Sequence, residues 1–251
     1  MSRLEEALAQ ADRQKLQDHV VRASEDIIQF KRKHLSILNK DNPMAVKIGF
    51  TEHATALKQF LLSIDQEQLF KPKSSGFCYM SEIWLRGDYD KHLPPKDDAE
   101  TTLKVLDLAS HVIDDIRKAT SKIIGQETTV FRSYIDTIDS TSCIIPHSDG
   151  FLHHRIGFRV HVPLFTSTRS YGVNTTPKFW RMGEEGSIVI FNNFEPHTVT
   201  KMEDEQKYRS HLICDIGVKS CIDGLNDLDT LAAKAIIHGY GLGTTLDYSP
   251  N

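Results

Sequence analysis

The sequence predicts an α+β protein in which a β-rich second half forms a sandwich or barrel flanked by helices. After Gly125, short stretches of aromatic and β-branched residues alternate with turn-forming pairs such as Asp149-Gly150 and Glu185-Gly186, which is typical of many short antiparallel strands. Before Gly125, apolar residues recur at helical spacing. A chain of 251 residues is long enough to bury a sizeable core.

Amphipathic segments form the predicted helical part. Residues 4–38 carry apolar residues at mostly helical spacing until Asn42-Pro43, because the residue before a proline is disfavoured in a helix. Residues 54–70 show the same spacing. The clearest helix is predicted at 97–124, since it begins with an Asp-Asp-Ala-Glu capping box and is followed by a glycine. We expect the apolar stripes to pack against the β core, and the first is also a candidate dimer interface.

The predicted strands comprise one early stretch and a long later series, separated by the helix at 97–124. The early strand is 77–85, and a last helix is predicted at 226–238. We therefore expect a helical N-terminal region over 1–76, a β core over 77–220 that includes helix 97–124, and a C-terminal helix and tail over 221–251. The later strands are predicted at 127–138, 143–147, 156–165, 178–182, 187–191, 197–201 and 208–218.

Composition narrows the class of protein. The net charge of −4 argues against a nucleic-acid partner, which a basic face would attract. No apolar run reaches the roughly 18–20 residues of a membrane span, and the N-terminus lacks the apolar core of a signal peptide. The four cysteines form no CxxC pair, so we expect reduced thiols in a cytoplasmic protein.

A metal-binding pattern lies within the β series. In an extended chain, side chains two residues apart point to the same side, so His147 and Asp149 can reach one ion. His197 follows the predicted strand 187–191. Two histidines and one carboxylate form the facial triad of non-haem Fe(II) oxygenases, which leaves positions open for other ligands. Arg209, on the next strand, is suited to a bidentate pair with a carboxylate.

Strand parity predicts a polar interior. Along 157–164, Arg159 and His161 share one face and apolar side chains the other, and Arg209 and His211 are separated in the same way from Leu212, Cys214 and Ile216. Because buried unpaired arginine is costly, this pattern indicates that an anion binds inside.

These residues resemble the aspartyl/asparaginyl β-hydroxylase type of 2-oxoglutarate/Fe(II) oxygenases, which includes cis-proline hydroxylases. The resemblance covers roughly residues 130–217. It is carried by "PHSD", by "RVHVPL", by the stretch from Trp180 to His197 and by "RSHLICD" from Arg209 to Asp215.

The resemblance implies a fold and a ligand set. The fold is a double-stranded β-helix, the jelly roll of cupin-like proteins, with flanking N-terminal and mid-chain helices. His147, Asp149 and His197 would bind Fe(II). Arg209 would hold the distal carboxylate of 2-oxoglutarate, and Arg159 with His161 its metal-bound end. A further cosubstrate contact comes from the strand before the first histidine, where Arg132, Ser133 and Tyr134 are all candidates.

The implied activity is hydroxylation of an unactivated C–H bond of an amino acid, free, carrier-bound or in a peptide, with O2 consumed and 2-oxoglutarate converted to succinate and CO2. Two alternatives stay open: an oxygenase of this class acting on another small metabolite, and a non-catalytic metal-binding jelly-roll module. The sequence names no substrate. It also assigns no role to His153, His154 and Arg155, which are expected to be solvated loop residues unless they close over the site.

Overall fold

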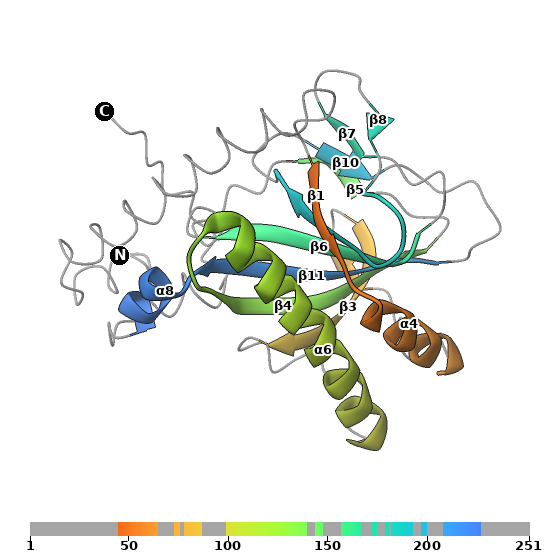
Figure 1. Ribbon diagram of the computed structural model, residues 1–251. Helices are drawn as coiled ribbons and strands as arrows, with labels where there is room; N and C mark the ends of the chain where they lie inside the picture. Colours follow the sequence, from red (N-terminus) through yellow and green to blue (C-terminus); the bar gives the residue numbers. More distant parts are fainter. Residues whose placement is uncertain are drawn as a thin grey trace, which may run out of the picture.

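The computed structural model shows two antiparallel sheets, with helices on one face of the larger sheet (Figure 1). The larger sheet has seven strands in the order β1-β9-β6-β11-β4-β3-β2, and the smaller has four in the order β5-β10-β7-β8. The structure describes residues 45–64, 73–75, 78–86, 99–139, 144–147, 157–166, 172–174, 179–180, 182–192, 197–199 and 208–226.

The elements have the following bounds. The helices are α4 (His53–Ser63), α6 (Ala99–Ile124) and α8 (Lys219–Asn226). The strands are β1 (Ala45–Phe50), β2 (Lys73–Ser75), β3 (Cys78–Arg86), β4 (Thr128–Asp139), β5 (Ile144–His147), β6 (Phe158–Phe165), β7 (Gly172–Asn174), β8 (Phe179–Trp180), β9 (Ser187–Phe191), β10 (His197–Val199) and β11 (Tyr208–Val218).

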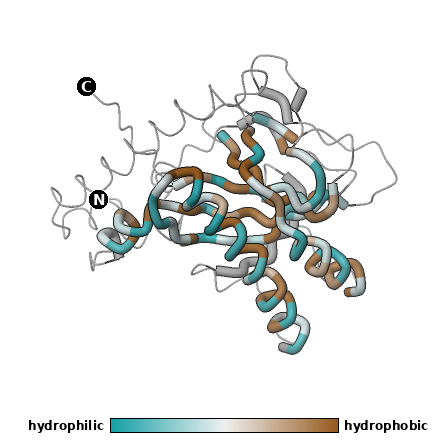
Figure 2. Tube along the Cα trace, viewed as in Figure 1, coloured by the Kyte–Doolittle hydropathy of each residue, from teal (hydrophilic) through white to brown (hydrophobic). Residues whose placement is uncertain are grey.

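The main hydrophobic core lies between the larger sheet and the helices α4 and α6. Both helices bury apolar residues at helical spacing, so hydrophobic and hydrophilic stretches interleave along their trace (Figure 2). Strands β6, β9 and β11 contribute alternate side chains to this core. The fully buried members include Leu57, Leu61, Ala109, Val112, Ile116, Val160, Val162, Leu164, Ile190, Leu212, Cys214 and Ile216. The predicted apolar face of residues 158–164 is therefore confirmed.

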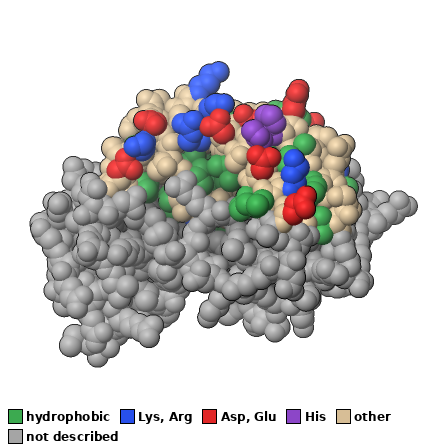
Figure 3. Space-filling view, turned by 90° about the horizontal axis from the view of Figure 1, so that it is seen from below, with side chains coloured by type: hydrophobic (Ala, Val, Ile, Leu, Met, Phe, Trp, Pro, Cys, Tyr) green, Lys and Arg blue, Asp and Glu red, His purple; other side chains and the backbone are tan. Residues whose placement is uncertain are grey.

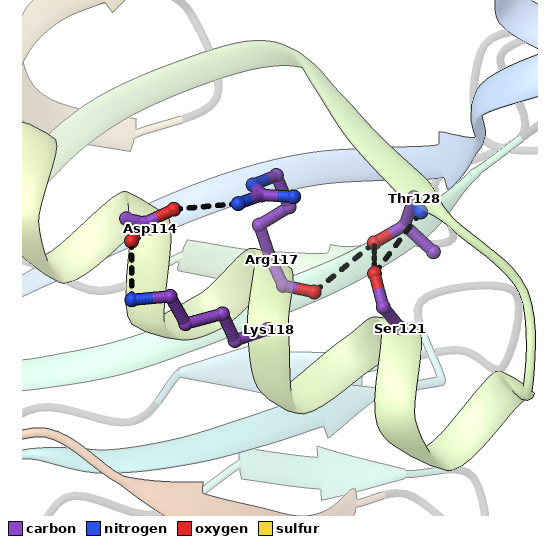
Figure 4. Close-up of polar contacts among 5 residues, drawn as sticks. All are labelled: Asp114, Arg117, Lys118, Ser121 and Thr128. Atoms are coloured by element: carbon purple, nitrogen blue, oxygen red, sulfur yellow. Dashed lines mark hydrogen bonds and ion pairs between the residues drawn. The ribbon is translucent and has the colours of Figure 1, made fainter.

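Polar contacts fix the end of α6 against the start of β4 (Figure 4). The helix ends at Ile124, and the next residue, Gly125, has a φ of 76° that is favourable for glycine and donates its N–H to the Ser121 carbonyl at 2.9 Å. The Ser121 and Thr128 hydroxyls lie 2.8 Å apart, and the Thr128 hydroxyl also donates to the Arg117 carbonyl. This junction sets the position of β4, which borders β11 in the sheet.

The face in Figure 3 carries charged side chains of both signs around a histidine patch. Among the exposed residues, His53 of α4 and His111 of α6 stack with ring centroids 5.2 Å apart. Lys58 pairs with Glu185 at 2.5 Å and thereby links α4 to the turn before β9. None of the described helices combines the length and apolar composition needed to cross a membrane.

The described elements agree with most of the sequence-based predictions. The helix at 97–124, the early strand and the later strands are confirmed within one to three residues at most ends. The predicted helix 54–70 is observed as α4 up to Ser63, and the predicted helix 4–38, the capping aspartates and residues 227–238 lie outside the described residues.

Four elements differ from the predictions. Residues 45–50 and 73–75, inside the region predicted to be helical, form β1 and β2 of the larger sheet, so that sheet begins before residue 77. Residues 172–174, between the predicted strands 156–165 and 178–182, form β7, and a helix already begins at Lys219. β1 pairs with β9, which lies far away in the sequence, where periodicity carries no signal. The other elements are only three to eight residues long, too short to show a clear period.

Gly186→Ala is expected to destabilise the fold more than Gly125→Ala. Both glycines have positive φ, 82° and 76°, which costs an alanine about 1–2 kcal/mol. A Cβ at Gly186 would also lie 2.8 Å from the Thr51 carbonyl oxygen, whereas one at Gly125 meets nothing within 4 Å. Overpacking adds roughly 1–3 kcal/mol. Urea unfolding of the full chain measures the difference, and equal losses would contradict the packing seen here.

Candidate iron and 2-oxoglutarate site

The larger sheet has a polar face opposite the helices. On β11, Leu212, Cys214 and Ile216 belong to the core, so the alternate residues point the other way. The strand register places His211 opposite Asp136, Asp215 opposite both Arg132 and Arg159, and His161 opposite Ile213. The described ionisable side chains of this polar face are Arg132, Asp136, Arg159, His161, Arg209, His211 and Asp215. All seven are buried or nearly so.

The two predicted histidine ligands lie opposite each other on neighbouring strands. His197 is the first residue of β10, is 7% exposed, and is the register partner of His147 at the end of β5. Directly paired residues of antiparallel strands have Cβ atoms about 4.5–5.5 Å apart. The Thr198 hydroxyl donates to the Ile144 carbonyl and strengthens this pairing. Of the predicted ligands, Asp149 lies outside the described residues, and the described side chains include only that of His197.

Phe191 connects His197 to the polar face. Its ring makes edge contacts with the His197 ring, at a centroid distance of 4.9 Å, and with the His161 ring, at 5.4 Å. The His161 ring in turn meets the His211 ring edge to face at 5.6 Å. The predicted metal position and the polar face therefore belong to one contiguous group of side chains, with an apolar ring between them.

Arg209, His211 and His161 form a buried hydrogen-bonded group. The Arg209 Nη2 lies 3.2 Å from His211 Nδ1, and the His161 Nδ1 lies 3.3 Å from the same atom. Arginine can only donate, so His211 Nδ1 is an acceptor and its other nitrogen carries the proton. His161 must then donate through its Nδ1–H. The ring protons of His211 are therefore defined, and His161 carries a proton on Nδ1.

Burial and the neighbouring charges set the protonation of this group. Burial lowers the pKa of Arg209 to about 10, while the Asp136 carboxylate acts in the opposite direction, so the guanidinium is charged at neutral pH. Burial, together with Arg209 and His161, holds the pKa of His211 well below its usual value. His211 is therefore a neutral imidazole, in agreement with its role as an acceptor.

Arg159 is paired with an aspartate that the sequence did not assign to the site. Its Nε and Nη2 atoms contact the two Asp215 carboxylate oxygens at 3.0 and 3.3 Å, and Arg132 Nη1 lies 3.6 Å from Asp215 Oδ2. The bidentate geometry holds the guanidinium in one orientation. In the sequence, only the strand parity that Asp215 shares with Arg209 indicates that its side chain lies on the polar face. The pairing itself is not visible in the sequence, because Arg159 and Asp215 are 56 residues apart.

The three candidates for the further cosubstrate contact separate onto two faces. Ser133 lines a pocket between α6 and β4, on the helix side, and its register partner Cys214 belongs to the core. Arg132 and Tyr134 lie on the polar face, where the guanidinium sits 5.0 Å from the Tyr134 ring centroid. The site geometry therefore leaves Arg132 and Tyr134 as candidates. His153, His154 and Arg155 lie outside the described residues.

The chain is similar to known proteins in part of its sequence and in its fold. The family model described as aspartyl/asparaginyl beta-hydroxylase matches residues 111–218, a segment that contains all the predicted ligands. No curated protein matches the chain.

Solved structures with similar folds include an oxidoreductase of the 2OG-Fe(II) oxygenase family from Burkholderia pseudomallei. Its TM-score is 0.51 at 14% identity, and the match covers 73% of this chain and 89% of that one. A prolyl-4-hydroxylase from Pseudomonas putida has a TM-score of 0.44 at 14% identity, covering 70% and 91% of the two chains. A prolyl hydroxylase from Trichoplax adhaerens has 0.48 at 13%, covering 85% and 97%. The first of these likenesses shows a shared fold.

Proposed function

We propose that this chain is an Fe(II)/2-oxoglutarate-dependent dioxygenase of hydroxylase type. The match of residues 111–218 to the aspartyl/asparaginyl beta-hydroxylase family model supports this proposal. It hydroxylates an unactivated C–H bond of an amino acid, free, carrier-bound or within a peptide. 2-Oxoglutarate is converted to succinate and CO2 in the same turnover. In this proposal the two antiparallel sheets are the two halves of a double-stranded β-helix.

The observation that carries the proposal is the register of β5 and β10, which pairs His147 with His197 beside a buried arginine-rich face. Two imidazoles and one carboxylate are the donor set of non-haem Fe(II) oxygenases. His147 and His197 supply the imidazoles from neighbouring strands, and Asp149 follows His147 by two residues. These residues fit an iron site and would hold the metal.

The iron, when bound, supplies the activation of O2 coupled to oxidation of 2-oxoglutarate, which no protein side chain provides. The protein's own residues bind and orient. Arg209 is buried and charged, and its Nε–H has no hydrogen-bond partner among the described residues, so it is suited to the distal carboxylate of 2-oxoglutarate. Phe191 packs on His197 and His161 and excludes water from the space between them.

The charge of the polar face supports an anionic ligand. Among its described side chains, three arginines face two aspartates, and the histidine whose protonation is defined, His211, is neutral. One positive charge is left over in a buried environment, where electrostatic attraction to a carboxylate is strong. Asp215 is shared by Arg159 and Arg132, and Asp136 acts on Arg209, so the excess positive charge belongs to the face as a whole.

A substrate screen tests the amino-acid part of the proposal. Pools of free amino acids and short peptides are incubated with the enzyme, Fe(II), 2-oxoglutarate and O2, and each pool is analysed by mass spectrometry for a product heavier by one oxygen. The proposal expects such a product in an amino-acid or peptide pool only. A product from a pool of other small metabolites would instead favour the wider oxygenase alternative, and metal binding with no product in any pool would favour the non-catalytic module.

A further inference from the structure

His211 is a fully buried polar side chain to which neither the sequence nor the proposed function assigns a role. It is 0% exposed, lies in the centre of the larger sheet between β4 and β6, and faces Asp136 and Pro163 in register. An apolar side chain of similar size would satisfy packing alone. Burying an imidazole costs free energy of folding unless its nitrogens form hydrogen bonds.

One nitrogen of His211 is used to hold Arg209. Its Nδ1 accepts from the Arg209 guanidinium at 3.2 Å and lies 3.3 Å from the His161 Nδ1 donor. Two donors converging on one lone pair fix both the imidazole and the guanidinium. Arg209 and His211 are two residues apart on one strand face, so the contact is local and depends little on the rest of the fold.

The second nitrogen of His211 is a donor without a partner. With Nδ1 as acceptor, the proton of the neutral ring is on Nε2, and this atom is buried with no hydrogen-bond partner among the residues that the structure describes. The Arg209 Nε donor is also buried and has no hydrogen-bond partner among the described residues. Two buried donors on adjacent side chains of one face call for an acceptor that enters from outside the chain.

We propose that His211 is a positioning residue that holds the Arg209 guanidinium for a carboxylate and donates its own Nε2–H to the same anion. The inference rests on the proposed function, because the anion it names is the distal carboxylate of 2-oxoglutarate. It adds a determinant of cosubstrate affinity that acts both through Arg209 and by a hydrogen bond of its own, and that is separate from the metal ligands.

The test compares His211→Leu with His211→Asn in the full chain. Leucine removes both nitrogens, whereas the asparagine side chain offers an oxygen near the Nδ1 position that can accept from Arg209. Ser210→Ala is the matched control, since Ser210 is an equally buried neighbour whose hydroxyl contacts Thr137 on the opposite face. Calorimetric titration with 2-oxoglutarate in the presence of Mn(II) measures affinity without turnover, and titration with Mn(II) alone measures the metal site.

We expect His211→Leu to weaken 2-oxoglutarate binding about tenfold or more, since hydrogen bonds to charged groups are involved. Mn(II) affinity should stay within about twofold of the native value. His211→Asn should recover part of the loss, and Ser210→Ala should bind 2-oxoglutarate like the native chain. In turnover, the KM for 2-oxoglutarate should rise more than kcat falls.

Two results would overturn the inference. Native 2-oxoglutarate affinity in His211→Leu would remove the role of His211 while leaving the proposed function intact. Equal losses of Mn(II) and 2-oxoglutarate affinity, without recovery in His211→Asn, would reduce His211 to a packing residue. If the native chain itself binds no 2-oxoglutarate, the proposed function fails, and this inference fails with it.

Discussion

Replacing His197 with alanine is expected to reduce the affinity for Fe(II) or Mn(II) by at least about 100-fold, because even indirect supports of a metal ligand contribute 10–100-fold. His197 is buried at the start of β10 and is paired with His147 across the two strands. Its removal takes away one of three proposed ligands, and no other described histidine pairs with His147. Metal-dependent oxidation should fall below detection.

The measurement is a titration of the metal-free protein with Mn(II), followed by thermal unfolding without metal to check the fold. His111→Ala is the matched control, because His111 is an exposed histidine on α6 that stacks only on His53 among the rings described. The control should bind metal like the native chain. If His197→Ala also binds metal with native affinity, the ligand assignment is wrong.

Replacing Asp215 with alanine is expected to destabilise the protein by about 3–5 kcal/mol, as is typical when one partner of a buried ion pair is removed. Asp215 is 1% exposed and neutralises Arg159 through a bidentate pair, with Arg132 at 3.6 Å. Without the carboxylate, two nearly buried guanidinium groups face each other. For a chain of this size the loss corresponds to a fall in Tm of roughly 10 °C.

The contrast with a surface ion pair makes this test specific. Lys47 and Glu184 are separated by only 2.5 Å, but their side chains are 49% and 69% exposed. Exposed pairs contribute about 0–1 kcal/mol, so Glu184→Ala should change the free energy of unfolding little. Denaturant unfolding of both variants provides the comparison. An Asp215→Ala variant as stable as Glu184→Ala would mean that the buried arginines are satisfied in some other way.

Most of the strands, and the division of the larger sheet into two faces, were predictable from the sequence. Alternation along β6 and β11 fixed which side chains point to the core, because a strand has a period of two residues. The predicted separation of Phe158 and Val160 from Arg159 and His161 follows from that period alone. The end of α6 was equally predictable, since a glycine at residue 125 with positive φ is a common helix terminus.

Features that depend on distant partners were not predictable in this way. β1 is a short segment whose identity as a strand comes from pairing with β9, about 140 residues later. The engagement of Arg159 by Asp215 requires knowledge of the β6–β11 register. The use of His211 as an acceptor for Arg209 requires distances, because strand parity shows only that the two side chains share a face.

Formation of succinate from 2-oxoglutarate is the most direct test of the proposed function. The native chain and His147→Ala are each incubated with Fe(II), O2 and the substrate pools, and succinate is quantified with and without oxygen. We expect succinate from the native chain, dependent on both iron and oxygen, at a rate at least about 100-fold above that of His147→Ala. Equal rates from the two proteins, or no succinate from a native chain that binds iron and 2-oxoglutarate, would contradict the proposed oxygenase activity.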